Sequence, residues 1–128
     1  MQYEYFYGSQ AEQFSFYRIP KALFTEPNFR ELSTDAKVLY GILLDRMSLS
    51  LKNQWLDAQN KVYIIFTVEE IMDALNCANQ KATRLMVELE KRAGLIERKR
   101  QGLGRPNLIY VKNFAATING KSCEKGDS

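Results

Sequence analysis

One stretch of the chain, residues 79–92, is predicted to form a helix whose outward face carries side chains able to pair with DNA bases. Gln can form two hydrogen bonds with adenine, and Lys and Arg can pair with guanine or with phosphate. Glu88 and Glu90 follow on the same helix and would be repelled by phosphates, so we expect only its N-terminal half to enter a major groove. The alternative is a solvated helix face that packs beside a partner protein. The DNA contacts predicted on this helix are Asn79, Gln80, Lys81, Thr83 and Arg84.

A predicted β-hairpin, residues 95–111, carries a second group of candidate residues. Basic side chains crowd its tip around Gly102 and Gly104. Because alternate residues of a strand point to opposite faces, Arg98 and Arg100 share one face and Lys99 takes the other. Cations on such a hairpin generally meet phosphate or the minor groove. The alternative is that they protect the edge of a sheet. The DNA contacts predicted here are Arg98, Lys99, Arg100, Gln101 and Arg105.

The positive charge of the chain is concentrated on this hairpin. The whole chain has a formal net charge of +3, whereas residues 94–113 contain five basic residues and one acidic residue. A local surplus of this kind is what a phosphate-binding surface requires. We therefore expect double-stranded DNA as a partner.

The residue types needed for catalysis or metal binding are scarce. The chain has no histidine, and Cys77 and Cys123 are its only cysteines. The residues needed for a zinc site, a disulfide scaffold or His-based catalysis are therefore lacking. Glu69, Glu70 and Asp73 are clustered carboxylates, but they belong to a capping sequence and a helix face. No apolar run approaches the ~20 residues of a membrane span. We therefore predict no catalytic residues, no cofactor, no metal, no membrane contact and a reducing, cytoplasmic setting.

The elements that position these residues follow from local signals between residues 67 and 111. Thr67 and Glu70 form a capping box for a first helix, which Asn76 ends. Asn79 is a candidate N-cap for the second helix and Gly94 is a candidate stop. Two apolar stripes have helical spacing: Val68, Ile71, Met72 and Leu75, then Ala78, Ala82, Leu85, Met86 and Leu89. Helix, turn, helix and hairpin are the order of a winged helix-turn-helix.

A third and longer helix is predicted before this unit. Ser33 caps it, Asn53 closes it, and Gly41 inside it suggests a close backbone contact. The β-branched and aromatic run Val62–Phe66 predicts a strand that pairs with the hairpin. The predicted fold is therefore α+β, a winged helix-turn-helix with a three-helix core, a small antiparallel sheet and a β-hairpin wing. The core stripe of the long helix is Ala36, Leu39, Leu43 and Met47, widened by Tyr40 and Ile42.

The two ends of the chain differ from this central part in composition. Residues 1–24 form an aromatic N-terminal extension that holds eight of the fourteen Phe and Tyr residues. Residues 25–114 form the winged-helix domain, and residues 115–128 are a polar linker or tail. The aromatic rings either cover the core of their own domain or form an arm on a second subunit. In the second case, the predicted dimerisation residues are Tyr3, Tyr5, Phe6 and Tyr7.

Three strings make the chain resemble the N-terminal domain family of plasmid replication initiator A proteins. They are FSFYRIPKALF at 14–24, LSTDAKVLYGILLDRMSLSLKN at 32–53 and ERKRQGLGRPNLIYVKNF at 97–114. The three strings occur in the family's order, and the likeness extends over residues 1–114.

The resemblance implies a winged-helix domain that binds repeated sites at a replication origin, usually as a homodimer, in the bacterial cytoplasm. In that family a separate C-terminal domain recruits the replication machinery, and nothing in this sequence matches such a domain. By resemblance, the helix that reads DNA corresponds to residues 79–92 and the wing to residues 95–111.

The leading hypothesis is therefore sequence-specific binding of double-stranded DNA at a plasmid or mobile-element replication origin. A transcriptional repressor would use the same chemistry at a promoter. A winged-helix module for protein–protein docking is the alternative from a different class, and it would not retain DNA.

Overall fold

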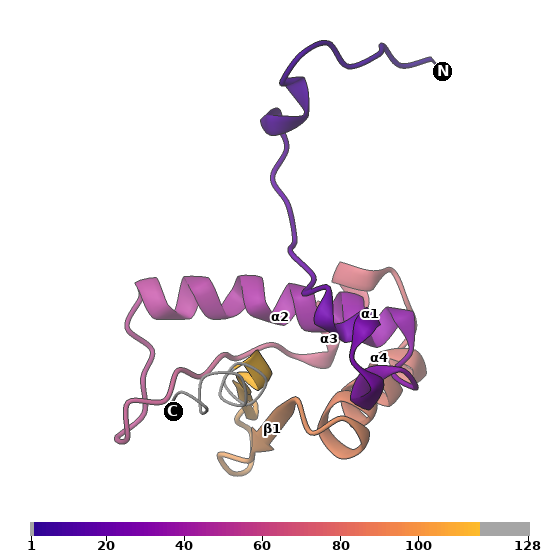
Figure 1. Cartoon of the computed structure of the whole chain (residues 1–128). Helices are drawn as coiled ribbons and strands as arrows, with labels where there is room; N and C mark the ends of the chain where they lie inside the picture. Colours follow the sequence, from indigo (N-terminus) through magenta and orange to yellow (C-terminus); the bar gives the residue numbers. More distant parts are fainter. Residues whose placement is uncertain (1, 116–128) are drawn as a thin grey trace, which may run out of the picture.

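The computed structural model describes residues 2–115, which form an α+β fold with four α-helices and one two-stranded antiparallel hairpin (Figure 1). Residues 116–128 of the predicted tail lie outside the described residues. The helical elements are η1 (Gln10–Gln13), α1 (Ala22–Thr25), η2 (Pro27–Phe29), α2 (Thr34–Lys52), α3 (Val68–Leu75), α4 (Asn79–Val87) and η3 (Glu88–Arg92). The strands are β1 (Ile96–Lys99) and β2 (Leu108–Val111).

Helix α2 is the long element against which the rest of the fold packs. Its N-cap is Ser33, whose hydroxyl accepts a hydrogen bond from the Ala36 backbone N–H at 3.2 Å, and its C-cap is Asn53. Both predicted boundaries are confirmed. The predicted core stripe is also confirmed, except that Met47 is half-buried: Ala36, Leu39, Tyr40, Ile42 and Leu43 are buried. The Tyr40 hydroxyl donates a hydrogen bond to the Lys112 carbonyl at 2.7 Å, and burial raises the pKa of Tyr40 to about 12.

Gly41 makes the close backbone contact that the sequence suggests. A Cβ at this position would lie 2.9 Å from Cγ1 of Ile19 and 3.0 Å from the carbonyl oxygen of Arg18. The absence of a side chain therefore lets the chain that precedes α1 cross directly over α2. This contact anchors the root of the N-terminal extension.

Helices α3 and α4 are both present where the sequence predicts helices, with one boundary shifted. Thr67 and Glu70 form the capping box at the start of α3, and Asn76 ends that helix in the left-handed conformation with φ 53°. The prediction that Asn79 caps α4 is wrong. Ala78 is the N-cap, in extended conformation, and its carbonyl accepts from the Ala82 backbone N–H, so Asn79 is the first helical residue.

The predicted helix over residues 79–92 is α-helical only as far as Val87. Residues Glu88–Arg92 form a π-helical segment, η3, in which the Ala93 backbone N–H donates to the Glu88 carbonyl at 3.1 Å. Gly94 then adopts φ 66° and ends the helical run, as predicted. The chain reverses there and enters β1.

The sheet is smaller than the sequence predicts. Strands β1 and β2 pair with Ile96 opposite Val111 and Lys99 opposite Leu108. The segment 62–66 is not a third strand, because it pairs with β2 only at an isolated bridge between Ile64 and Ile109. Val62 pairs with Leu56 instead, so the segment divides its hydrogen bonds between two partners. Within residues 2–115 the sheet therefore has two strands and one added bridge.

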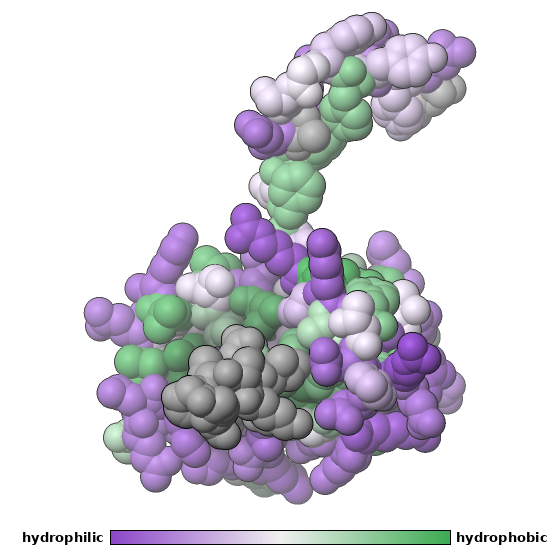
Figure 2. All heavy atoms as spheres, viewed as in Figure 1, coloured by the Kyte–Doolittle hydropathy of each residue, from purple (hydrophilic) through white to green (hydrophobic). Residues whose placement is uncertain are grey.

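The N-terminal extension stands away from the rest of the protein. Figures 1 and 2 show it projecting from the α2 side as an isolated strip of chain. Tyr3 and Tyr5 are each 83% exposed, and Phe14 packs edge-to-face on Phe6 and Phe16, with ring centroids 6.0 and 6.2 Å apart. The interpretation that these rings cover their own core is therefore wrong for the extension. The exposed aromatic residues of this segment are Tyr3, Tyr5, Phe6, Tyr7, Phe14, Phe16 and Tyr17.

Candidate nucleic-acid interface

Helix α4 separates its buried and exposed residues cleanly. Ala82, Leu85 and Met86 are buried against the core. The opposite face is exposed and polar, because it carries Asn79, Gln80, Thr83 and Arg84. Within residues 2–115, the side chains of Gln80 and Arg84 form no hydrogen bond or ion pair. Both are therefore available to an external partner.

The other candidate side chains on α4 have contacts within the protein. Nζ of Lys81 lies 2.7 Å from Oδ2 of Asp35 at the start of α2, and the two side chains are 42% and 51% exposed. An exposed ion pair of this kind contributes at most about 1 kcal/mol, so a phosphate can replace Asp35. The Thr83 hydroxyl donates to Oδ1 of Asn79 over 3.5 Å, at the limit of hydrogen bonding.

The N-terminal end of α4 is electrostatically open to an anion. Whereas Ser33 and Thr67 cap α2 and α3, no side chain caps α4, and its first turn contains no acidic residue. A helix N-terminus carries a partial positive charge and unpaired N–H groups. This end of α4 therefore favours an approach to phosphate.

Glu88, one of two carboxylates expected to disturb DNA binding, has an internal partner. It accepts a hydrogen bond from the Ser33 hydroxyl at 2.9 Å and another from the Ser33 backbone N–H. Its carboxylate thus caps the approach to α2 and links that helix to the end of α4. The charge faces α2 rather than the exposed surface of α4.

Glu90, the second carboxylate, is paired with Arg98 of β1. Oε1 of Glu90 accepts from Nε of Arg98 at 2.8 Å and lies 2.8 Å from Nη2, while Oε2 accepts from the Arg98 backbone N–H at 3.2 Å. Burial tends to raise the pKa of Glu90, but the hydrogen bonds and charge of Arg98 outweigh it and hold that pKa below its ordinary value. Arg98 is therefore half-buried and neutralised, unlike the other cations of the hairpin.

The remaining hairpin cations are exposed. Lys99 lies on the outer face of β1, and Arg100 and Arg105 flank the tip. Gln101, a predicted DNA contact, holds the tip in shape, because its Nε2 donates to the Pro106 carbonyl at 2.8 Å. The polar candidates of the hairpin therefore form two groups. Arg98 and Gln101 have partners within the protein, whereas Lys99, Arg100 and Arg105 are exposed to solvent.

The exposed face of α4 and the hairpin are connected through η3. Strand β1 packs against η3, which continues α4 without a break. Figure 1 shows α4 and β1 on the opposite side of α2 from the N-terminal extension. The two elements that carry the candidate DNA contacts therefore lie on one side of α2, away from the aromatic extension.

Sequence reasoning missed two ion pairs and one exposed residue on this side. The pairs Lys81–Asp35 and Arg98–Glu90 join elements that are separate in the chain. Leu103, at the hairpin tip, is 98% exposed. Its position between two glycines in a cationic hairpin is the sequence signal that could have identified it.

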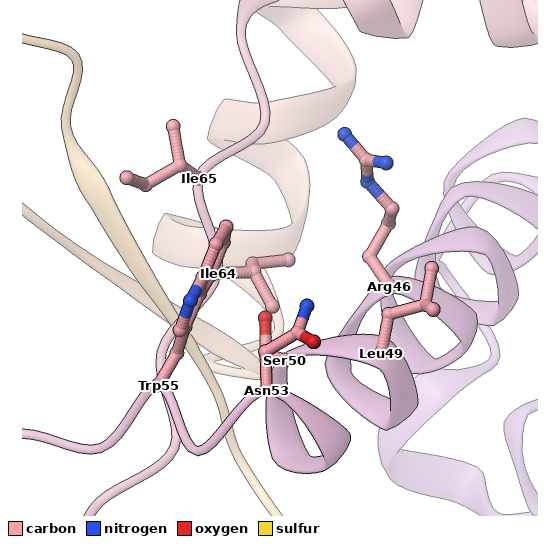
Figure 3. A pocket seen from close by; sticks show the side chains of 7 residues that line it. All are labelled: Arg46, Leu49, Ser50, Asn53, Trp55, Ile64 and Ile65. Carbon is pink, nitrogen blue, oxygen red and sulfur yellow. The ribbon is translucent and has the colours of Figure 1, made fainter.

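One cavity, of about 130 Å³, lies at the C-terminal end of α2 (Figure 3). It lies between Arg46, Asn53 and Trp55 and is floored by Ile64. Sites for small molecules usually measure roughly 300–1,000 Å³, so this cavity is too small for one. The Arg46 guanidinium beside the cavity already has a partner, because its Nη2 lies 2.8 Å from Oε2 of Glu70. The cavity therefore offers no candidate active site.

Among residues 2–115, no three His, Cys, Asp or Glu side chains are placed to hold a metal ion. Over the same part of the chain, no helix has the length and apolar character required to cross a membrane. The exposed polar face of α4 and the hairpin cations remain the candidate site.

Comparison with solved structures gives three close matches. A structure described as the N-terminal domain of a DNA-binding protein is 36% identical, with a TM-score of 0.72 over 99% of this chain and 98% of that one. A Rep–DNA complex is also 36% identical, with a TM-score of 0.72 over 98% of both chains. An MDR initiator is 38% identical, with a TM-score of 0.67 over 93% of this chain and 98% of the other.

Sequence comparison agrees with these structures. A 41 kDa protein of Lactobacillus helveticus is 32% identical over 103 residues, which are 80% of this chain but only 28% of that protein. The matched region therefore spans less than a third of the length of that relative. Residues 15–125 match the family described as the replication initiator protein A (RepA) N-terminus. Because the match covers most of its length, the chain belongs to this replication initiator family.

Proposed function

We propose that this chain binds double-stranded DNA in a sequence-specific manner at repeated sites of a plasmid or mobile-element replication origin. It acts as a winged helix-turn-helix in which α4 lies in the major groove and the hairpin is the wing. The observation that carries the proposal is the exposed face of α4, where Gln80 and Arg84 have no partner within residues 2–115. Family membership and the similar Rep–DNA complex support the same function.

The proposed readers of base edges are Gln80 and Arg84. Gln can form two hydrogen bonds with adenine, and Arg can do the same with guanine. Asn79 and Thr83 add shorter polar contacts, and Lys81 exchanges Asp35 for a phosphate beside the open N-terminus of α4. Glu88 does not oppose this approach, because Ser33 holds its carboxylate.

The hairpin positions the protein on the backbone rather than reading sequence. Lys99, Arg100 and Arg105 are the proposed phosphate contacts, because all three are exposed. Gln101 shapes the tip through its bond to the Pro106 carbonyl. Arg98 enters the proposal as a structural residue, since Glu90 holds both its guanidinium and its backbone N–H.

The proposed assembly is a homodimer that uses the N-terminal extension. Residues 2–17 expose a row of aromatic rings, among them Tyr5, Phe6 and Tyr7, that make few contacts with the body of the protein. Rings of this size stabilise an interface strongly when a second surface covers them. A dimer would also match repeated sites, because two α4 helices would enter successive major grooves.

Replication would also require a contact with the replication machinery. The 41 kDa relative is much longer than the matched region, which leaves room for a further domain that recruits the replication machinery in the bacterial cytoplasm. Residues from 115 onward would then act as the linker. In this arrangement the present chain delivers the initiator to its origin.

Selection of binding sites from a pool of random duplexes is the direct test. We expect repeated copies of one short motif, and we expect a duplex carrying it to bind roughly 10³-fold or more tightly than scrambled duplex at physiological salt. An Arg84→Ala variant serves as a matched control, since it should lose preference at one base position. The absence of any enriched motif, together with no retention of duplex at low salt, would contradict the proposal and favour a protein-docking module.

A further inference from the structure

Leu103 is the most exposed large hydrophobic residue among the described residues. Its exposure is 98%, compared with 83% for the next residues, Tyr3 and Tyr5. Gly102 and Gly104 flank it with φ angles of 122° and 76°. The isobutyl group therefore stands clear of the protein at the apex of the hairpin, where it gains nothing from folding.

The apex that presents Leu103 is closed by hydrogen bonds. The Arg105 backbone N–H donates to the Gly102 carbonyl at 3.2 Å, and Nε2 of Gln101 donates to the Pro106 carbonyl at 2.8 Å. Both bonds join a residue that precedes Leu103 to one that follows it. The backbone that carries Leu103 is therefore held in place, which lowers the entropy that is lost when this tip enters a binding site.

The surroundings of Leu103 fit a nucleic acid better than a protein surface. Exposed cations precede it at Lys99 and Arg100 and follow it at Arg105, and residues 98–107 contain no acidic side chain. An apolar tip between two groups of cations matches the minor groove, where phosphates line both rims and the deoxyribose and base edges form the walls. Proteins that bend DNA insert apolar side chains of this type between base steps.

We propose that Leu103 enters the minor groove and wedges into a base step, so that the duplex bends toward α4. The proposal rests on the function proposed above and adds a specific contact to it. The hairpin cations hold the two phosphate rims while the leucine side chain lies between them. Base pairs beside the α4 site would then contribute to sequence specificity, because base steps differ in how easily they unstack.

The test uses the full chain, a fluorescent duplex carrying a motif recovered by selection, and a scrambled duplex of equal length. Energy transfer between dyes at the two duplex ends reports bending, and 2-aminopurine placed at successive steps reports unstacking. We expect the wild-type protein to bend the duplex by roughly 20–90° and to raise 2-aminopurine fluorescence at one step outside the α4 motif. The melting temperature of each variant shows that it is folded.

The decisive variants change the apex without changing charge. Leu103→Ala and Leu103→Gln should abolish the fluorescence rise, remove most of the bend and weaken binding roughly tenfold. Leu103→Met should retain all three properties, because it preserves an apolar side chain of similar length. The salt dependence of binding should be unchanged in every Leu103 variant, and Leu51→Ala, which removes another exposed leucine on α2, should behave as the wild type.

Three results would overturn the inference. If Leu103→Ala binds, bends and unstacks the duplex as the wild type does, the apex is not in the groove, although the proposed DNA binding would stand. If Leu103→Ala instead lowers the oligomeric mass in sedimentation, the leucine belongs to a protein contact. Failure of the wild-type chain to bind any duplex would overturn the proposed function, and the inference with it.

Discussion

Replacing Arg98 should destabilise the protein while leaving its salt-dependent DNA binding intact. The suggested change is Arg98→Met, which keeps the apolar stem and removes the guanidinium. Exposed ion pairs contribute up to about 1 kcal/mol, whereas loss of one partner from a buried pair costs about 3–5 kcal/mol. The Arg98 and Glu90 side chains are 26% and 15% exposed, between these limits. We therefore expect a loss of about 1–2 kcal/mol in unfolding free energy.

Thermal unfolding followed by circular dichroism measures this loss. One kcal/mol corresponds to a melting-temperature shift of roughly 4–8 °C in a domain of 60–100 residues, so Arg98→Met should melt several degrees lower. Glu90→Gln and the double variant complete a double-mutant cycle. The double variant should be more stable than the two single losses predict, because each single variant leaves one partner unpaired.

The pH dependence supplies an independent check. The pKa of Glu90 is lowered in the folded protein, so the ion pair stabilises the fold above the ordinary glutamate value and is lost as the pH falls through the lowered one. The difference between the wild type and Arg98→Met should therefore shrink between pH ~7 and pH ~3. An unchanged melting temperature at neutral pH, combined with a salt slope for DNA binding that flattens by about 0.9, would refute the reasoning and make Arg98 a phosphate contact.

Three further variants test other parts of the structure. Arg84→Ala should weaken binding to the selected motif by roughly 1–3 kcal/mol and scrambled duplex by less; equal losses in a titration would make Arg84 a phosphate contact. Deleting residues 2–12 should shift the chain toward monomer in sedimentation, and an unchanged mass would contradict the proposed dimer. Gly41→Ala should lower the melting temperature, because its Cβ would collide with Ile19 and Arg18. Alanine also favours the helix by ~1 kcal/mol relative to glycine, so a higher melting temperature would show that Ile19 and Arg18 can move aside.

The boundaries of α2 and α3, and the end of the helical run at Gly94, were predictable because their signals are local. Ser33 and the pair Thr67 and Glu70 satisfy backbone N–H groups within their own first turn, and Asn76 and Gly94 adopt left-handed conformations that end a helix. None of these signals requires knowledge of a distant partner. The exposed face of α4 was predictable for the same reason, since helical spacing separates polar from apolar positions.

The errors concern features that depend on distant partners. The segment 62–66 has strand propensity, but propensity does not reveal that Val62 pairs with Leu56 while Ile64 pairs with Ile109. The spacing of apolar residues does not distinguish the π-helical segment Glu88–Arg92 from an α-helix. The aromatic extension has the composition of a core segment, and only the folded chain shows its rings exposed.

Charge counting is the part of the sequence interpretation that the structure changes most. The surplus on residues 94–113 includes Arg98, whose charge is matched by Glu90 from outside that range. Lys99, Arg100 and Arg105 remain exposed, so the hairpin should contribute a salt slope of no more than about −2.7, at −0.9 per phosphate. The count of basic residues therefore overestimates the phosphate contacts, because the cation nearest the core stabilises the hairpin. Arg98, which orients the hairpin, and the residues proposed to hold DNA are different members of one basic run, and only their partners within the protein distinguish them.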